Sequence, residues 1–381
     1  MKTNTFKIKK NVFCLLLFAS LFLFNSCSTD IDEISTEKNA LEESVIDHAV
    51  KGKSSGSRGN AWAIYNGLPA NPEMQFHPSD QYINIQREST GLYKVTFPGL
   101  SHLNNGVIHV SGILGDDIAQ VRNWGRQGND LIAYVLTFDG DTGVRTNNQF
   151  FNIFLYKRNE SNISNAAYNF GNSVSYDYNS KDLRNQITRL QTGKYRVRFP
   201  GMQSVDGNNG HFQVTAYGMA PRYYEIESVT QNNSRGVEAI VRIYDINGNL
   251  ANSDFVASYT DKYLLYDFRP GGYLHYNGNN TPFNLKTDFP FNREVTVEKL
   301  GSGDTTYYLV TIPNSYANFA NIRPMPMVTS YGSSKEFAYV SYFLQYNGKL
   351  WMTINFRSLD GSPLSANPKF NLFYMIGGER Q

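Results

Sequence analysis

Cysteine, charge and long apolar runs are all scarce in this chain. Only 2 of its 381 residues are cysteines, and 18% are charged. Two cysteines cannot build a disulfide framework or a thiolate metal cluster. No segment has the dense Lys and Arg content of a nucleic-acid binder, which excludes nucleic acid as a partner. The apolar run Val12 to Phe24 has 13 residues, whereas a membrane-spanning helix needs about 20.

Several short motifs of common enzymes are also missing. The chain has no His-Glu-x-x-His motif, no phosphate-binding loop and no Gly-x-Gly-x-x-Gly. Its 6 histidines are scattered, and none has a second histidine at ligand spacing. We therefore predict no catalytic residue, no metal site and no cofactor.

The first 26 residues indicate an export signal. Four lysines precede the apolar run, which ends in Leu23-Phe24-Asn25-Ser26-Cys27. A basic start followed by a short apolar run is typical of a secretory signal peptide. Because Cys14 leaves with the signal, Cys27 is the only cysteine of the predicted mature chain.

The end of this signal resembles a known export motif. Ser26-Cys27 is similar to the lipobox of bacterial lipoproteins, and the acids that follow, Asp30, Asp32 and Glu33, resemble the signal of surface-exposed lipoproteins in Bacteroidetes. The resemblance implies a lipid on Cys27, which would anchor the protein in the outer membrane at the cell surface. The alternative is an ordinary signal peptide with an incidental cysteine.

After residue 60 the sequence repeats itself. Gly91-Leu-Tyr-Lys-Val-Thr-Phe-Pro-Gly99 returns as Gly193-Lys-Tyr-Arg-Val-Arg-Phe-Pro-Gly201 and, more weakly, as Tyr308 to Pro313. Arg87 and Arg189 each stand four residues before the first Gly of their motif. Two further landmarks recur in the same order, a turn glycine (Gly143, Gly248, Gly361) and the phenylalanine that opens the closing strand (Phe150, Phe255, Phe370).

These landmarks divide the chain into five segments. The segment after the signal is acidic and then rich in Gly and Ser, which is typical of a flexible tether. The predicted segments are the lipoprotein signal peptide 1–26, the tether 27–59, and the repeats 60–160, 161–261 and 262–381.

Each repeat has the pattern of an all-β domain. Tyr93, Val95 and Phe97 are apolar and alternate with Lys94 and Thr96, which is the period of a strand with one buried face. Asn-Gly and Asp-Gly pairs separate such runs, and these pairs favour tight hairpins. A repeat of about 100 residues with several short strands predicts a β-sandwich or jelly-roll-like unit.

The motif Gly-x-Tyr-x-Val-x-Phe-Pro-Gly resembles a tandem all-β repeat of secreted bacterial proteins that has no assigned biochemical role. A looser likeness links the units to the jelly-roll heads of complement proteins, which form trimers. The three units either pack as such a trimer or follow one another like beads.

Carboxylates, among them Asp254, and a calcium loop are weak candidates. Asp139 and Asp245 stand beside the repeated turn glycine, where Asp usually bonds its own backbone. Asp245 to Asn249 superficially resembles a calcium loop, but its twelfth position is Val256 and not Glu.

Aromatic residues in the expected loops, outside the repeated motif, are the remaining candidates for a binding site. Aromatic rings beside Asn, Arg and Asp are typical of sugar-binding faces, where a ring covers the apolar side of the sugar. The predicted ligand-binding residues are Trp124, Arg122, Arg126, Tyr223, Tyr224, Tyr273 and Tyr276.

The leading hypothesis is a lipid-anchored surface protein that binds an extracellular glycan without catalysis. In its organisation the chain is similar to the starch-holding lipoproteins of Bacteroidetes, which are also tethered tandem β-domains. The first alternative is a structural or adhesion protein whose partner is a surface protein. The second is a polysaccharide hydrolase or lyase, which would need convergent charged groups in a cleft.

Overall fold

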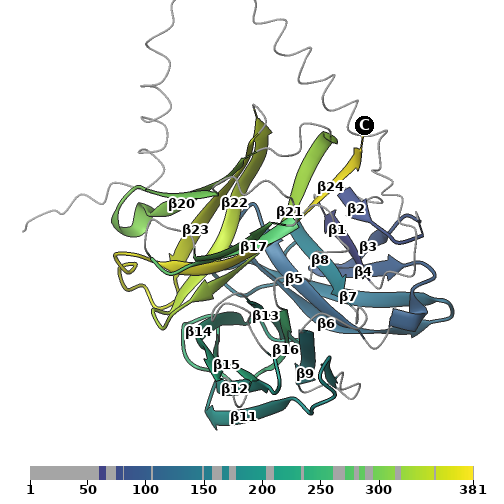
Figure 1. Ribbon diagram of the computed structural model, residues 1–381, viewed down its shortest axis with the longest axis horizontal. Coiled ribbons are helices and arrows are strands. Elements are labelled where there is room, and N and C mark those ends of the chain that lie inside the picture. Colours follow the sequence, from purple (N-terminus) through teal and green to yellow (C-terminus); the bar gives the residue numbers. More distant parts are fainter. Residues whose placement is uncertain are drawn as a thin grey trace, which may run out of the picture. The chain divides into compact units, whose positions relative to one another are not determined.

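The computed structural model consists almost entirely of strands (Figure 1). The predicted signal peptide, Cys27 and the tether lie outside the described residues, so the predictions about them stay predictions. The described residues fall in one compact part of the chain, 49–381. They are 60–65, 74–79, 81–103, 106–147, 150–156, 165–170, 177–202, 210–232, 236–260, 271–278, 283–287, 295–313, 319–346 and 349–380.

The strands form three successive sets of eight, which confirms the predicted all-β fold of three similar units. Unit 1 contains β1 (Asn60–Tyr65), β2 (Met74–Phe76), β3 (Asn84–Ser89), β4 (Leu92–Phe97), β5 (Val107–Ile113), β6 (Ile118–Gln127), β7 (Asp130–Phe138) and β8 (Phe150–Tyr156). Unit 2 contains β9 (Asn165–Phe170), β10 (Asp177–Asn179), β11 (Gln186–Gln191), β12 (Lys194–Phe199), β13 (His211–Tyr217), β14 (Tyr223–Asn232), β15 (Gly236–Tyr244) and β16 (Asp254–Thr260). Unit 3 contains β17 (Gly271–Tyr276), β18 (Phe283–Thr287), β19 (Thr296–Leu300), β20 (Tyr307–Pro313), β21 (Phe319–Tyr331), β22 (Glu336–Tyr346), β23 (Lys349–Ser358) and β24 (Lys369–Arg380). Two short 3-10 helices, η1 (Ser101–Leu103) and η2 (Gly303–Thr305), are the only helical elements in these residues.

The repeated motif forms a hairpin at the edge of each of the first two units. In β4 and β12 every second residue is buried, as the alternation predicts. Gly91 turns the chain into β4 with a φ of 62°, and a Cβ there would lie 2.6 Å from the Thr137 carbonyl oxygen. Only glycine therefore fits this turn without strain.

Each unit is a sandwich of two four-stranded halves. In unit 2 the halves are β10-β9-β16-β13 and β11-β12-β15-β14, and the second half is visible as a run of labelled strands in Figure 1. Apolar side chains from both halves make one core, in which the Tyr195 ring lies 5.2 Å from the Phe255 ring, edge to face. The pairs Tyr93–Phe151 and Tyr308–Phe370 occupy the same place in units 1 and 3.

The strand register corrects one sequence prediction. Phe150 was expected to correspond to Phe255. Ile113 and Tyr217 are the equivalent last residues of β5 and β13, and their cross-strand partners are Phe150 and Asp254. Phe150 therefore corresponds to Asp254. Phe151 is therefore the true counterpart of Phe255 and Phe370. The error arose because two adjacent phenylalanines open β8, and only the pairing decides which of them faces the core.

The halves of different units join edge to edge. Three eight-stranded sheets result, and each takes four strands from one unit and four from the next. The sheet orders are β19-β20-β23-β22-β5-β8-β1-β2, β10-β9-β16-β13-β6-β7-β4-β3 and β11-β12-β15-β14-β21-β24-β17-β18. Unit 1 thus joins unit 2, unit 2 joins unit 3, and unit 3 joins unit 1, so the units are packed in a cycle and are not beads.

Each junction is a short parallel pairing with the same local structure. The equivalent bridged pairs are Val121–Tyr217, Ile226–Tyr331 and Ile113–Val340, and the second junction has the additional pair Glu225–Ser330. Backbone N–H groups donate across each junction, from Gly218 to Val121 O (2.9 Å), from Gly332 to Ile226 O (2.8 Å) and from Leu114 to Val340 O (2.7 Å). Directly after Val121, Ile226 and Val340 the register shifts by a β-bulge. Such bulges end the regular pairing and bend the strand toward its next neighbour.

Polar side chains cross between units in the interior. His109 contacts Thr215 Oγ1 at 2.9 Å and Ser258 Oγ at 2.8 Å, both from unit 2. One step further along the cycle, Gln213 donates to Thr329 Oγ1 of unit 3 at 3.1 Å. Burial lowers the pKa of His109 to about 3. It is therefore neutral at physiological pH and acts as a hydrogen-bonding core residue.

A charged cluster near the turn before β8 also joins the units. Arg357 of unit 3 forms ion pairs with Asp116 (3.2 Å) and Asp141 (3.0 Å) of unit 1. Its guanidinium lies 5.9 Å from the Tyr223 ring of unit 2, and the Tyr223 hydroxyl donates to Gly140 O at 2.6 Å. This cluster therefore ties all three units together.

Candidate functional site

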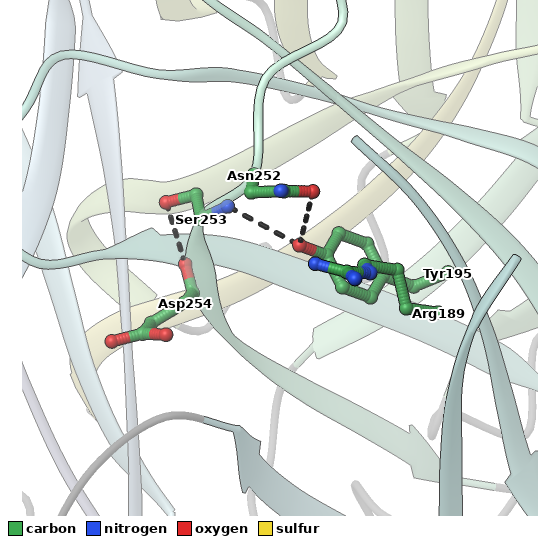
Figure 2. Close-up of a pocket in the computed structure, with 5 residues that line it drawn as sticks. All are labelled: Arg189, Tyr195, Asn252, Ser253 and Asp254. Atoms are coloured by element: carbon green, nitrogen blue, oxygen red, sulfur yellow. Dashed lines mark hydrogen bonds between the residues drawn. The ribbon is translucent and has the colours of Figure 1, made fainter. Parts of the chain in front are cut away.

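A recess opens at one edge of the unit 2 sandwich (Figure 2). Its volume is about 510 Å³, which lies in the usual range for small-molecule sites. Five side chains line it, namely Arg189, Tyr195, Asn252, Ser253 and Asp254.

Two strand features bring these side chains together. Arg189 on the edge strand β11 is the direct cross-strand partner of Tyr195 on β12, so both project from the same face of the sheet. Asn252, Ser253 and Asp254 are consecutive at the start of β16, which belongs to the opposite half of the sandwich. Figure 2 shows these three residues across the recess from Arg189 and Tyr195.

Hydrogen bonds hold the floor of the recess in place. Asn252 Oδ1 accepts from Gly193 N at 3.0 Å and from the Tyr195 hydroxyl at 3.3 Å. The Tyr195 oxygen in turn accepts from Ser253 N at 3.3 Å. The Tyr195 side chain is buried, so the hairpin turn, the ring and the start of β16 form one connected framework.

The charged side chains lie at the rim. Arg189 is exposed and Asp254 is partly exposed. Burial raises the pKa of the Asp254 carboxyl above its usual value. A guanidinium and a carboxylate on opposite walls offer donors to one hydroxyl and acceptors to another, which suits a ligand with adjacent hydroxyl groups.

The framework of the recess is repeated in the other units. The strand pairing places Arg87 and Tyr93 of unit 1 where Arg189 and Tyr195 stand in unit 2. Asn147 corresponds to Asn252, because its Oδ1 accepts from the turn glycine Gly91 as Asn252 Oδ1 accepts from Gly193. In unit 3 the counterparts are Lys299, Tyr308 and Asn367, and Lys299 Nζ donates to Asn367 Oδ1 at 3.3 Å.

One position of the recess differs in each unit. The counterpart of Asp254 is Phe150 in unit 1 and Lys369 in unit 3. Their cross-strand partners Tyr217, Ile113 and Tyr331, in that order, are the equivalent last residues of β13, β5 and β21. Unit 2 therefore combines the shared cation, tyrosine and asparagine with a carboxylate. The sequence showed Arg189 as a repeated residue and Asp254 as one of several carboxylates, but it did not show Asn252 or bring these residues together. The combination becomes visible only when the repeats are aligned by strand register.

The structure does not bring the predicted aromatic residues together as an exposed surface. Trp124 was expected in a loop, but it lies in β6, is 7% exposed and packs edge-on against Tyr217 at 5.6 Å. Of the arginines beside it, Arg122 is partly exposed and Arg126 is exposed. Trp124 lies on the core side of its strand, where apolar residues are expected.

The predicted tyrosines are also buried in strands. Tyr223 and Tyr224 open β14 and are 1% and 4% exposed. Tyr273 and Tyr276 lie in β17 and are each 1% exposed. Their rings therefore present no free face to a sugar in this structure, and their positions in strands correct the expectation that they lie in loops.

The acidic turns act as the sequence indicated. Asp139 Oδ1 accepts from Thr142 N at 2.7 Å, and Asp245 Oδ1 accepts from Asn247 N and Asn249 N, each at 2.9 Å. Both carboxylates therefore stabilise their own turns, as predicted. Within the described residues no group of three His, Cys, Asp or Glu side chains is placed to hold a metal ion.

Comparisons with known proteins found no similarity. No family model, no curated protein and no solved structure matches the chain. Among the described residues no helix is long and apolar enough to span a membrane. Function is therefore inferred from the geometry of the site.

Proposed function

We propose that this protein is a lipid-anchored cell-surface protein that binds an extracellular glycan without catalysis. The observation that carries the proposal is the recess of unit 2, which is large enough for a sugar ring and lined by hydrogen-bonding side chains. The lipoprotein resemblance at Cys27 supplies the location. A tether between the lipid and the folded units would keep the recess accessible to extracellular polymers.

The chemistry of the recess favours binding over hydrolysis. A glycosidase needs two carboxyl groups about 5–10 Å apart. Among the described lining residues, Asp254 is the only carboxylate. A carboxylate accepting from one hydroxyl while Arg189 donates to the next would orient a sugar without breaking a bond.

The test is a glycan array probed with the protein starting at Ser28, together with an assay for released sugar. We expect retention of a defined set of oligosaccharides with no release. Asp254→Asn and Arg189→Ala should each weaken retention by about tenfold, because each removes a charged hydrogen bond of about 1.4 kcal/mol.

Arg87→Ala is the matched control, since Arg87 holds the same place in unit 1 but lacks a carboxylate opposite it. It should leave retention unchanged. Release of sugar would replace the binding proposal with an enzymatic one. If both unit 2 variants are retained as strongly as the natural protein, the recess is not the binding site. If the protein is not retained by any glycan, a protein partner is favoured.

A further inference from the structure

Unit 3 carries an exposed sheet face whose composition differs from that of the same face in unit 2. The face belongs to β20, β23 and β22, which pair side by side. In β23 every second residue is buried, so Trp351, Thr353 and Asn355 project outward and are partly exposed. We name this surface the unit 3 face, and its residues are Tyr307, Leu309, Thr311, Tyr342, Leu344, Trp351, Thr353 and Asn355.

The strand register arranges these residues in rows. Leu309, Thr353 and Tyr342 are direct cross-strand neighbours in one row. The next row contains Thr311, Trp351 and Leu344. Strands lie about 4.8 Å apart and outward residues of one strand about 6.8 Å apart, so rings and hydroxyl groups alternate over distances comparable to one sugar ring.

The two outermost apolar side chains face solvent. Tyr342 is 51% exposed and Leu344 is 39% exposed. The bulge after Val340 sets their direction, since it shifts the register of β22 by one residue at Ser341. Phe343, which lies between them, is directed inward and packs against the core.

The same positions of unit 2 hold an ion-pair ladder. Glu227 bonds Lys194 at 2.8 Å and Arg242 at 2.7 Å, and Glu238 bonds Arg198 at 2.7 Å and Arg196 at 3.2 Å. By register their unit 3 counterparts are Ser341, Tyr307, Asn355, Trp351, Thr311 and Leu309. All six charged positions of unit 2 are therefore occupied by uncharged residues in unit 3.

From this replacement we infer that the unit 3 face binds a neutral polysaccharide chain. A surface of rings and aliphatic groups gains from covering apolar area, and the threonine and asparagine side chains between them accept and donate hydrogen bonds. A neutral sugar polymer has the matching chemistry, with apolar ring faces and hydroxyl edges. An anionic polymer would find no cation in the middle of the face. The inference goes beyond the recess, because it requires none of the recess residues.

Affinity gel electrophoresis of the chain from Ser28 tests this inference. The gels contain hydroxyethylcellulose, galactomannan, xylan or soluble starch as neutral polymers, and alginate as an anionic one. We expect retardation by at least one neutral polymer and none by alginate. Tyr342→Ser, which copies Ser228 of unit 2, and Trp351→Thr should each weaken the retardation by about tenfold.

A control variant and a comparison of the two assays make the test specific for the unit 3 face. Tyr82→Ser removes a tyrosine that is equally exposed, at 53%, but lies before β3 of unit 1, and it should change nothing. The half-exposed position of Tyr342 means that its variant should fold even if Trp351→Thr does not. Neither unit 3 variant changes a residue that lines the recess. Loss of retardation by the polymers with unchanged retention on the glycan array therefore distinguishes the unit 3 face from the recess.

Three results would overturn the inference. They are no retardation by any neutral polymer, retardation that both unit 3 variants leave intact, and equal retardation by alginate. Light scattering is measured in parallel. Dimers that Tyr342→Ser converts to monomers, without any effect on polymer binding, would instead make the face a contact between copies of the chain.

Discussion

Glu225 provides the most direct test of how the units are joined. It lies in β14 at the junction of units 2 and 3 and is fully buried. Its carboxylate accepts from the Tyr244 hydroxyl at 2.8 Å and from Ser334 N of unit 3 at 3.1 Å. Burial raises the pKa of Glu225 to about 7, against the lowering effects of these hydrogen bonds and of Arg242, and with a further raising effect of Glu336.

This raised pKa makes the charged form costly. In the unfolded chain the carboxyl titrates near 4.5, so the folded state binds the proton more tightly. The free energy of unfolding is therefore highest while Glu225 is protonated, and it falls as the pH rises from 4.5 through 7. Above pH 8 the loss from this one group amounts to about 3 kcal/mol.

Glu225→Gln removes the charge and keeps the shape of the side chain. The counterpart in unit 1 is Gln120, which is buried and bonds Gly218 O at 3.0 Å and Ala220 O at 2.8 Å across its own junction. A glutamine therefore suits this position in the fold. We expect the variant to be more stable than the natural protein by about 3 kcal/mol at pH 8, about 2 at pH 6 and less than about 0.5 at pH 4.5.

Urea denaturation of both proteins at these pH values measures the difference. Buried histidines such as His109 destabilise the fold as the pH falls below 6.5, but they do so equally in both proteins and cancel. Glu227→Gln is the matched control, since Glu227 is two residues away, 24% exposed and ion-paired; it should not stabilise the protein at any pH. A difference that is constant with pH, or that falls as the pH rises, would refute the reasoning.

Two further predictions concern packing between units. Gly140→Ala should destabilise the protein by about 1–3 kcal/mol in urea denaturation, because its Cβ would collide with the Asp116 carbonyl and lie 2.8 Å from Arg357 Nη1. Gly125→Ala, whose Cβ would meet nothing within 4 Å, should change stability by less than about 0.5 kcal/mol. A chain of residues 60–261 lacks unit 3, which leaves the edges of β5 and β14 without their partner strands. We expect this chain to elute as aggregates in size-exclusion chromatography. A stable monomer that unfolds cooperatively would contradict the closed cycle.

The strands were predictable from local pattern. Tyr93, Val95 and Phe97 alternate with polar residues in sequence, and all three are buried in the structure. Hairpin glycines such as Gly91 mark the turns between strands. Both signals depend on residues that are near in sequence, which is why they survive without any tertiary information.

The cyclic pairing was not predictable in the same way. Each junction depends on one or two bridged pairs. Val340–Ile113, for example, joins residues 227 positions apart, and nothing in the local pattern distinguishes these edges from exposed ones. The buried tyrosines misled for a related reason. Tyr223 stands beside Pro221 and Arg222, which is typical of a loop, yet contacts from the other two units bury its ring.

Only some residues of the recess could be predicted from the sequence. The shared arginine showed in the sequence because Arg87 and Arg189 keep the same distance from their motifs. Asp254 showed only as one of several carboxylates. Its difference from the counterparts Phe150 and Lys369 was hidden, because Phe150 was mistakenly aligned with Phe255. Strand register, and not sequence spacing, therefore identifies the residue that is specific to unit 2.

The covalent continuity of the cycle has an evolutionary consequence. Three identical subunits around the same centre would have to accept every substitution three times, so that a histidine at the position of His109 would appear in all of them. In the single chain that position is His109, Gln213 and Met327. Because the three units are encoded separately within one chain, a substitution in one unit does not have to occur in the other two. One copy can then acquire a carboxylate and another an uncharged face, while the shared edges keep the assembly closed.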